Sequence, residues 1–236
     1  MTIAENIALV RENIDAAARE TGRTGRDITL VGASKMNDAA ACREAIAAGI
    51  DALGENRVQE MRQKLSENAY DGAPLHFIGH LQRNKVRQVV GQVALIQSVG
   101  SEALLLKIEK AAAALNLVQP ILLEVNIGGE AAKSGFAPSE LFAAAEKSLD
   151  LPHVRMSGVM TIPPFDADRP MTLRYFQETY ALYVDIREKL FHNVPMELSM
   201  GMSGDYADAV RAGATMVRVG TAIFGARHYD TGGART

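Results

Sequence analysis

Cysteine, excess charge and long apolar segments are all scarce in this chain of 236 residues. Cys42 is its single cysteine, so an internal disulfide is impossible and a reducing compartment is indicated. Lysine and arginine number 25 against 28 aspartates and glutamates, and the net charge of −3 gives no electrostatic basis for binding nucleic acid. The longest uncharged apolar stretch, residues 111–123, is too short to span a bilayer. We therefore expect a cytoplasmic protein that binds neither nucleic acid nor a membrane.

Two kinds of signature are also missing. The first residues have neither the basic nor the apolar region of a secretory signal peptide. The histidines do not have the spacing of metal ligands, so we expect no metal site. The five histidines are His76, His80, His153, His192 and His228.

Strand and helix patterns alternate along the chain. Residues 2–20 have the apolar periodicity of an amphipathic helix, which Thr2 and Glu5 would begin with a capping box. Short apolar runs typical of buried strands follow, and each is followed by a helix-like segment. The predicted strands are residues 28–34, 51–56, 75–79, 93–98, 120–127, 154–162, 195–200 and 215–219.

This alternation predicts an α/β fold with a parallel sheet. Eight units in a chain of 236 residues, with 47% hydrophobic residues and no obvious linker, fit a single-domain (β/α)8 TIM barrel with an extra N-terminal helix. The single domain would span residues 1–236, with residues 227–236 as a loose tail. An open, doubly wound sheet is the weaker alternative because no G-x-G-x-x-G motif follows the first strand.

Small residues gather after the seventh and eighth predicted strands. Barrel enzymes bind ligands at the carboxyl ends of their strands, and phosphates often lie at these two loops. Ser199, Gly201 and Ser203 mark the first loop, and Gly220 and Thr221 mark the second. Glycine lets the backbone approach an anion, and hydroxyl groups add donors. The pair of loops predicts a phosphate site, with two ordinary glycine-containing turns as the alternative.

Two basic residues lie near this predicted site. Arg218 points opposite to Val217 and Val219, and inside a barrel it would need an anion or another acceptor. Lys35 follows the first strand and would share the rim with the phosphate loops. A lysine, a phosphate site and an arginine suggest a Schiff base with a phosphorylated aldehyde, and pyridoxal 5′-phosphate (PLP) has both groups. A solvated Lys35 and a structural ion pair at Arg218 are the alternatives.

Motifs spread over nearly the whole chain form a specific pattern. In these motifs and their order the chain resembles the pyridoxal-phosphate homeostasis proteins, which are single-domain relatives of the alanine racemase barrel. The motifs are LVGASK (30–35), GEN (54–56), HFIG (76–79) with Gln82, Asn84 and Lys85, VNI (125–127) with Glu130 and KSG (133–135), GVM (158–160), LSMGMS (198–203) and VRVGTAIFGAR (217–227).

The resemblance implies roles for individual residues. Lys35 would hold PLP as an internal aldimine, and Arg218 would face the pyridine nitrogen and keep it unprotonated. No residue of this chain is assigned a catalytic role. Ser199, Gly201, Gly220 and Thr221 would hold the phosphate, with Ser203 as a further candidate, and Asn56 and Met160 would line the ring pocket.

The resemblance also implies a function. Alanine racemases have a second, β-rich domain that supplies a catalytic acid/base, and this sequence ends just past the eighth predicted strand. We therefore expect a monomeric PLP-binding protein that maintains vitamin B6 homeostasis and delivers the cofactor to apo PLP-dependent enzymes without turnover. A PLP-dependent racemase or lyase acting on a small amino acid is the main alternative. A phosphosugar-binding barrel enzyme, with no covalent adduct at Lys35, is a third.

Overall fold

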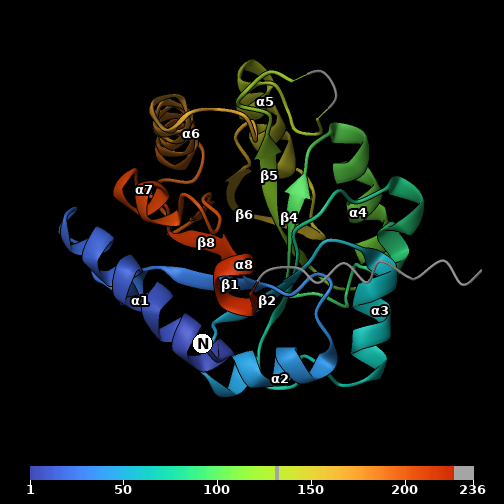
Figure 1. The fold of residues 1–236 in the computed structure, drawn as a ribbon. Coiled ribbons are helices and arrows are strands. Elements are labelled where there is room, and N and C mark those ends of the chain that lie inside the picture. Colours follow the sequence, from blue (N-terminus) through green and yellow to red (C-terminus); the bar gives the residue numbers. More distant parts are fainter. Residues whose placement is uncertain (131–132, 226–236) are drawn as a thin grey trace, which may run out of the picture.

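Eight parallel strands close into a barrel in the computed structural model, which describes residues 1–130 and 133–225. The strand order around the barrel follows the sequence, and β8 pairs with β1 to close it (Figure 1). The strands are β1 (Thr29–Ala33), β2 (Ala52–Glu55), β3 (Leu75–Phe77), β4 (Leu95–Val99), β5 (Gln119–Val125), β6 (Val154–Thr161), β7 (Glu197–Ser199) and β8 (Met216–Val219).

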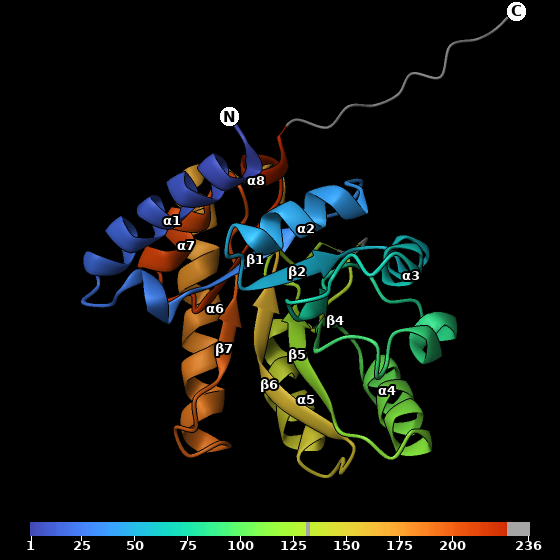
Figure 2. The same ribbon diagram turned by 90° about the horizontal axis from the view of Figure 1, so that it is seen from below.

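Helices surround the strands on the outside of the barrel (Figure 2). The first, α1 (Ile3–Arg19), precedes β1 and begins with the predicted capping box: the Glu5 N–H donates to Thr2 Oγ1, and the Thr2 N–H donates to Glu5 Oε2. The other helical elements are η1 (Gly25–Asp27), α2 (Ala39–Ala47), α3 (Val58–Ser66), η2 (Arg83–Gln88), α4 (Glu102–Ala114), α5 (Pro138–Ser148), α6 (Arg169–Lys189), α7 (Tyr206–Arg211) and α8 (Thr221–Phe224).

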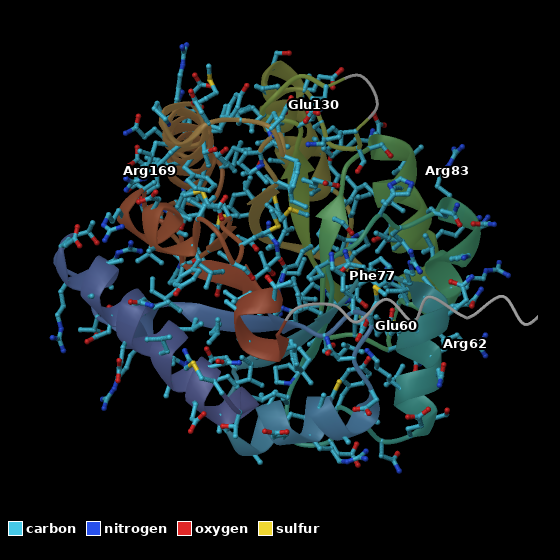
Figure 3. All side chains as sticks on the ribbon, viewed as in Figure 1. Glu60, Arg62, Phe77, Arg83, Glu130 and Arg169 are labelled. Carbon is cyan, nitrogen blue, oxygen red and sulfur yellow. The ribbon has the colours of Figure 1, made fainter. Side chains whose placement is uncertain are left out.

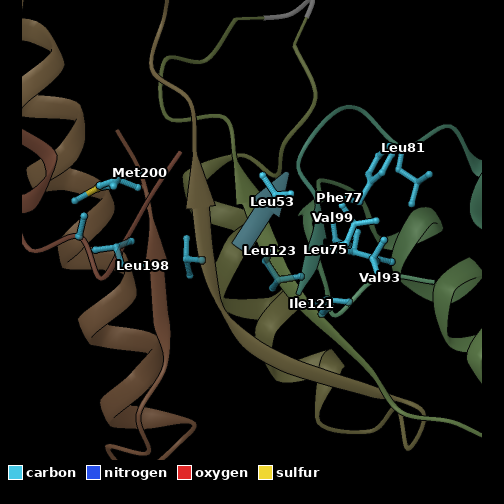
Figure 4. Packing of buried hydrophobic residues seen from close by; sticks show 14 of the residues in the cluster. Leu53, Leu75, Phe77, Leu81, Val93, Val99, Ile121, Leu123, Leu198 and Met200 are labelled. Atoms are coloured by element: carbon cyan, nitrogen blue, oxygen red, sulfur yellow. The ribbon is translucent and has the colours of Figure 1, made fainter. Parts of the chain in front are cut away.

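The alternation of side chains along each strand divides the apolar core into two parts. A small cluster inside the barrel takes its buried members from six strands, and it includes Val31, Leu122 and Met160. A larger cluster lies between the strands and the helices, where Leu53 and Ile121 are among its members (Figure 4). Side chains that leave a strand on its inner face are therefore the ones that can reach a ligand in the barrel mouth.

The observed fold confirms the predicted single-domain (β/α)8 barrel with its extra N-terminal helix. The first strand ends at Ala33, so Lys35 lies just beyond the strand. The predicted loose tail, residues 227–236, falls outside the described residues. Within the described part of the chain, no helix combines the length and the apolar character needed to cross a membrane.

Candidate functional site

The carboxyl ends of β1, β7 and β8 are neighbours at one mouth of the barrel. β8 pairs with β1 on one side and with β7 on the other. The half-buried Lys35 follows β1, and Gly220 directly follows β8. A Cβ atom added to Gly220 would lie 3.4 Å from the carbonyl oxygen of Ala33, so the two loops are in contact. The structure thus brings Lys35 and the predicted phosphate loops to the same rim.

Ser203 joins the loops that follow β7 and β8. Its Oγ accepts hydrogen bonds from the backbone N–H groups of Gly220, at 3.1 Å, and Ala222, at 3.3 Å. Gly201 has a φ of +91°, and a Cβ atom there would lie 2.5 Å from the Cβ of Ala209, so a larger residue does not fit. Thr221 is exposed at the start of α8. Two backbone N–H groups thus converge on one oxygen here, as they would on an oxygen of an anion.

Arg218 extends into the barrel interior. The register pairs it with Val31, a member of the inner cluster, so the two side chains share a face. Its guanidinium donates from Nη1 to Ser199 Oγ at 2.6 Å and from Nη2 to the Thr161 carbonyl at 2.9 Å. Burial lowers the pKa of Arg218 to about 10, and Glu124 opposes this effect from a distance. Arg218 is therefore still a cation at neutral pH, with neutral hydrogen-bond acceptors around it.

A chain of buried hydrogen bonds continues from Arg218 across the interior. Arginine can only donate, so Ser199 accepts from it and directs its own hydrogen to Gln97 Oε1, at 2.7 Å. The Gln97 amide nitrogen then donates to Nδ1 of His76, at 3.0 Å, which assigns the ring proton to Nε2. Burial lowers the pKa of His76 to about 4, so this imidazole is neutral.

The hydrogen bonds of Ser199 bear on the expectation that this residue holds a phosphate. The hydroxyl hydrogen of Ser199 is directed at Gln97, and the lone pair that faces Arg218 is already in use. A hydroxyl without a free hydrogen cannot donate to an anion. The position of Ser199 therefore favours a role in holding Arg218, while Gly201, Ser203, Gly220 and Thr221 lie at the loops themselves.

Three more side chains reach the mouth from β2, β5 and β6. Asn56 follows β2, and in the described structure its buried Oδ1 atom has no hydrogen-bond partner. Met160 is fully buried in the inner cluster. Glu124 is paired with Met160 in register and so faces inward, where burial raises the pKa of its carboxyl group. A buried acceptor without a donor is costly, so Asn56 fits a ligand that offers a hydrogen.

Sequence reasoning did not identify Gln97, His76 or Glu124 as residues of this site. Each is a polar residue at an inward-facing position of a buried strand. Gln97 interrupts the apolar run of the fourth strand, and that break in the pattern is the signal that could have identified it. Its partners could not be read from the sequence, because Ser199 is 102 residues away.

Comparison with known proteins identifies the family. The family model described as "Alanine racemase, N-terminal domain" matches residues 6–228. A pyridoxal phosphate homeostasis protein of Aquifex aeolicus is 40% identical over 231 residues, which cover 97% of this chain and 100% of the relative. The protein of that name from Pseudomonas aeruginosa is 41% identical over 229 residues, 97% of each chain. The chain belongs to the pyridoxal phosphate homeostasis protein family. The resemblance inferred from the motifs is thereby confirmed.

Solved structures of family members superpose on nearly the whole chain. PipY of Synechococcus elongatus PCC7942 without PLP has a TM-score of 0.85 at 34% identity, covering 95% of this chain and 100% of PipY. PipY with PLP bound has a TM-score of 0.82 at 33% identity, with the same coverage. Alanine racemase of Clostridium difficile 630 has a TM-score of 0.72 at 16% identity, over 97% of this chain and 61% of the racemase. This last likeness concerns the barrel fold alone.

Proposed function

We propose that this protein binds pyridoxal 5′-phosphate at the mouth of the barrel, as a Schiff base with Lys35, and maintains vitamin B6 homeostasis in the cell. The observation that carries the proposal is the meeting of three features at one end of the barrel: Lys35, the loops joined by Ser203, and the inward-facing Arg218. The PLP-bound structure of PipY, a relative over the full length, supports the same cofactor.

The residues at the mouth fit the chemical groups of PLP. The aldehyde requires an amine, which Lys35 supplies. The phosphate would lie at Gly201, Ser203, Gly220 and Thr221, beside the hydroxyl groups of Ser203 and Thr221 and the two backbone N–H groups that donate to Ser203 Oγ in this structure. Asn56 offers a buried oxygen that lacks a donor, and Met160 offers an apolar surface to the ring.

Arg218, held by Ser199 and the Thr161 carbonyl, would face the ring nitrogen. A fixed cation at that nitrogen disfavours its protonation. Bound PLP can act as an electron sink for bonds at the α-carbon of an amino acid, and a protonated ring nitrogen strengthens that action. Arg218 would therefore bind the ring while weakening its reactivity.

This arrangement favours a carrier over a catalyst. In the proposal, the protein keeps free PLP low and delivers it to apo PLP-dependent enzymes without turnover. We further propose that it acts as a monomer in the cytoplasm, where its single cysteine, the buried Cys42, would stay reduced. A visible absorption spectrum with added PLP, repeated after borohydride reduction, tests whether PLP forms a Schiff base with Lys35.

For that test, we expect a Schiff-base band in the wild type, trapped by borohydride on the Lys35 peptide and absent from Lys35→Ala. Lys189→Ala is the matched control, because Lys189 is an exposed lysine on α6 that pairs with Asp185. It should retain the full band. A wild-type protein without a band, or a trapped adduct on another lysine, would contradict the proposal.

A racemase or lyase is the second candidate, and Glu124 is the observation that favours it. Its inward-facing carboxyl has a raised pKa because of burial, so it can carry a proton near the mouth. The carrier predicts that PLP-loaded protein reactivates an apo-enzyme and does not turn over amino acids. Racemisation or α,β-cleavage of a small amino acid well above the rate of free PLP, lost in Glu124→Gln, would favour the enzyme instead.

A further inference from the structure

The backbone around Lys35 has an unusual conformation. Ser34 is buried, and its N–H donates to the Gly54 carbonyl of β2 at 3.0 Å. Met36, on the other side of Lys35, has a φ of +64°, in the left-handed region that residues with a Cβ atom rarely adopt. Such a conformation persists when surrounding contacts hold it. The chain therefore turns sharply at Lys35.

Two side chains of α3 hold the backbone on either side of Lys35. Lys64 Nζ donates to the carbonyl oxygen of Ser34 at 2.8 Å. The N–H of Met36 donates to Glu60 Oε1. Glu60 and Lys64 are one helical turn apart and form an ion pair of 3.0 Å between Oε1 and Nζ. The same pair of residues thus determines the position of the peptide groups that precede and follow the Lys35 side chain.

Glu55 anchors this pair from β2. Its Oε1 lies 2.6 Å from Lys64 Nζ, with 0% of the Glu55 side chain and 5% of the Lys64 side chain exposed. Ser34 Oγ and Tyr70 OH also donate to Oε1 of Glu55, at 2.6 Å and 3.1 Å. Burial favours a lower pKa for Lys64, but the carboxylates of Glu55 and Glu60 outweigh it and the pKa of Lys64 is raised. Lys64 is therefore a buried donor whose charged form is favoured by the two neighbouring carboxyl groups.

Of the three side chains Glu55, Glu60 and Lys64, that of Glu60 is the most exposed. It lies on α3, on the same side of the barrel as Arg83 of η2 (Figure 3). Its side chain is 20% exposed, against 0% for Glu55. A variant at Glu60 can therefore release the Met36 N–H without opening the buried core.

We propose that Glu55, Glu60 and Lys64 form a positioning device that holds the Lys35 amine in line with the aldehyde of PLP. This inference rests on the proposed function. In the covalent step the Lys35 nitrogen bonds to the aldehyde carbon, and its two amine protons leave with the aldehyde oxygen as water. Holding the backbone at Ser34 and Met36 restricts where the amine can lie, and such restraint accelerates a step between two bound groups. The device does not contact the cofactor.

The test separates covalent from non-covalent binding in the full-length protein. Pyridoxine 5′-phosphate has the ring and the phosphate but no aldehyde, so its affinity reports the pocket alone. The rate constant of band formation with PLP reports the covalent step. In Lys64→Met we expect this rate constant to fall about tenfold or more, which corresponds to about 1.4 kcal/mol, with less than a twofold change for pyridoxine 5′-phosphate.

Lys64→Met can fold because burial already raises the pKa of Glu55, which can take up a proton when its partner is lost. Lys189→Met, which breaks an exposed ion pair with Asp185, is the control and should change neither quantity. If Lys64→Met fails to fold, two variants at Glu60 test the positioning role instead. Glu60→Leu should slow band formation about fivefold, and Glu60→Gln, which retains an oxygen acceptor for the Met36 N–H, should restore most of the rate.

Two results would overturn the positioning role. One is an unchanged rate of band formation in both Lys64→Met and Glu60→Leu. The other is an equal loss of PLP reactivity and pyridoxine 5′-phosphate affinity, which would mean that the pocket itself has collapsed. In either case a normal wild-type band on Lys35 leaves the proposed function intact. A wild type with no band overturns the proposed function and this inference together.

Discussion

Two buried polar networks lie on opposite sides of the barrel wall, and their charge balance differs. Outside the strands, Lys64 contacts the carboxylates of Glu55 and Glu60. Inside the barrel, Arg218 donates to a hydroxyl and a carbonyl, and no ion pair within 4.0 Å involves it in residues 1–130 and 133–225. The cation of the outer network is thus paired by protein carboxylates, although Glu55 Oε2 has no hydrogen-bond partner among the described residues. The inner network still offers a cation to a ligand.

This difference in charge balance indicates that the inner network binds a ligand and that the outer network supports the structure. A buried cation without a carboxylate partner is expensive unless a ligand uses it, so Arg218 points to a binding surface. A buried cation with two carboxylates gains little from a ligand, and Lys64 is in any case directed at the Ser34 carbonyl. Both networks end at the same rim, one beneath the predicted ring position and the other behind Lys35.

The largest expected effect on the free energy of unfolding comes from removing the carboxylate of Glu55 from the outer network. Glu55→Leu leaves the Lys64 ammonium buried beside a single, partly exposed carboxylate. Losing one partner of a buried pair costs about 3–5 kcal/mol in the free energy of unfolding, which urea denaturation would measure. The double variant Glu55→Leu/Lys64→Met should recover at least half of the loss. A single variant within about 1 kcal/mol of wild type would mean that the pair is not buried in solution.

The inner network predicts a loss of stability in acid. Its His76 has a folded-state pKa of about 4, below the usual 6.5, so the unfolded chain binds the proton more tightly. The contribution of neutral His76 to the free energy of unfolding is fully present above pH 6.5. It declines as the pH falls, by about 3 kcal/mol at pH 4. His76→Gln cannot titrate and should have a flatter curve of unfolding free energy against pH. Parallel curves for the two proteins would refute the neutral, buried imidazole.

The smallest effect on stability is expected at Arg218, although it is buried. Arg218→Met loses two hydrogen bonds but also removes an unneutralised charge from the interior, so the free energy of unfolding should change by about 1 kcal/mol or less. The affinity for PLP should nevertheless fall about tenfold, measured by titration of the visible band. A stability loss as large as that of Glu55→Leu would remove the distinction between the two networks.

Arg218, Lys35 and Lys64 illustrate which residue positions the sequence predicts and which it does not. Alternation in the eighth strand predicted that Arg218 points opposite to Val217 and Val219, and the register confirms it. The position of Lys35 after the first strand followed from the apolar run before it. Lys64, by contrast, appears in the sequence as an ordinary helix-surface lysine, yet it is one of the most buried charges of the structure.

The sequence by itself determined the order of strands and helices, the side of each strand that a residue faces, and the family. These properties depend on neighbours along the chain, because backbone geometry alternates side chains with a period of two. The tertiary structure decided which polar groups meet: Gln97 with Ser199 across the interior, and Lys64 with Glu55 and Ser34 between helix and strand. Those pairings arise only when closure of the barrel removes water, because desolvation makes a buried donor or acceptor without a partner costly.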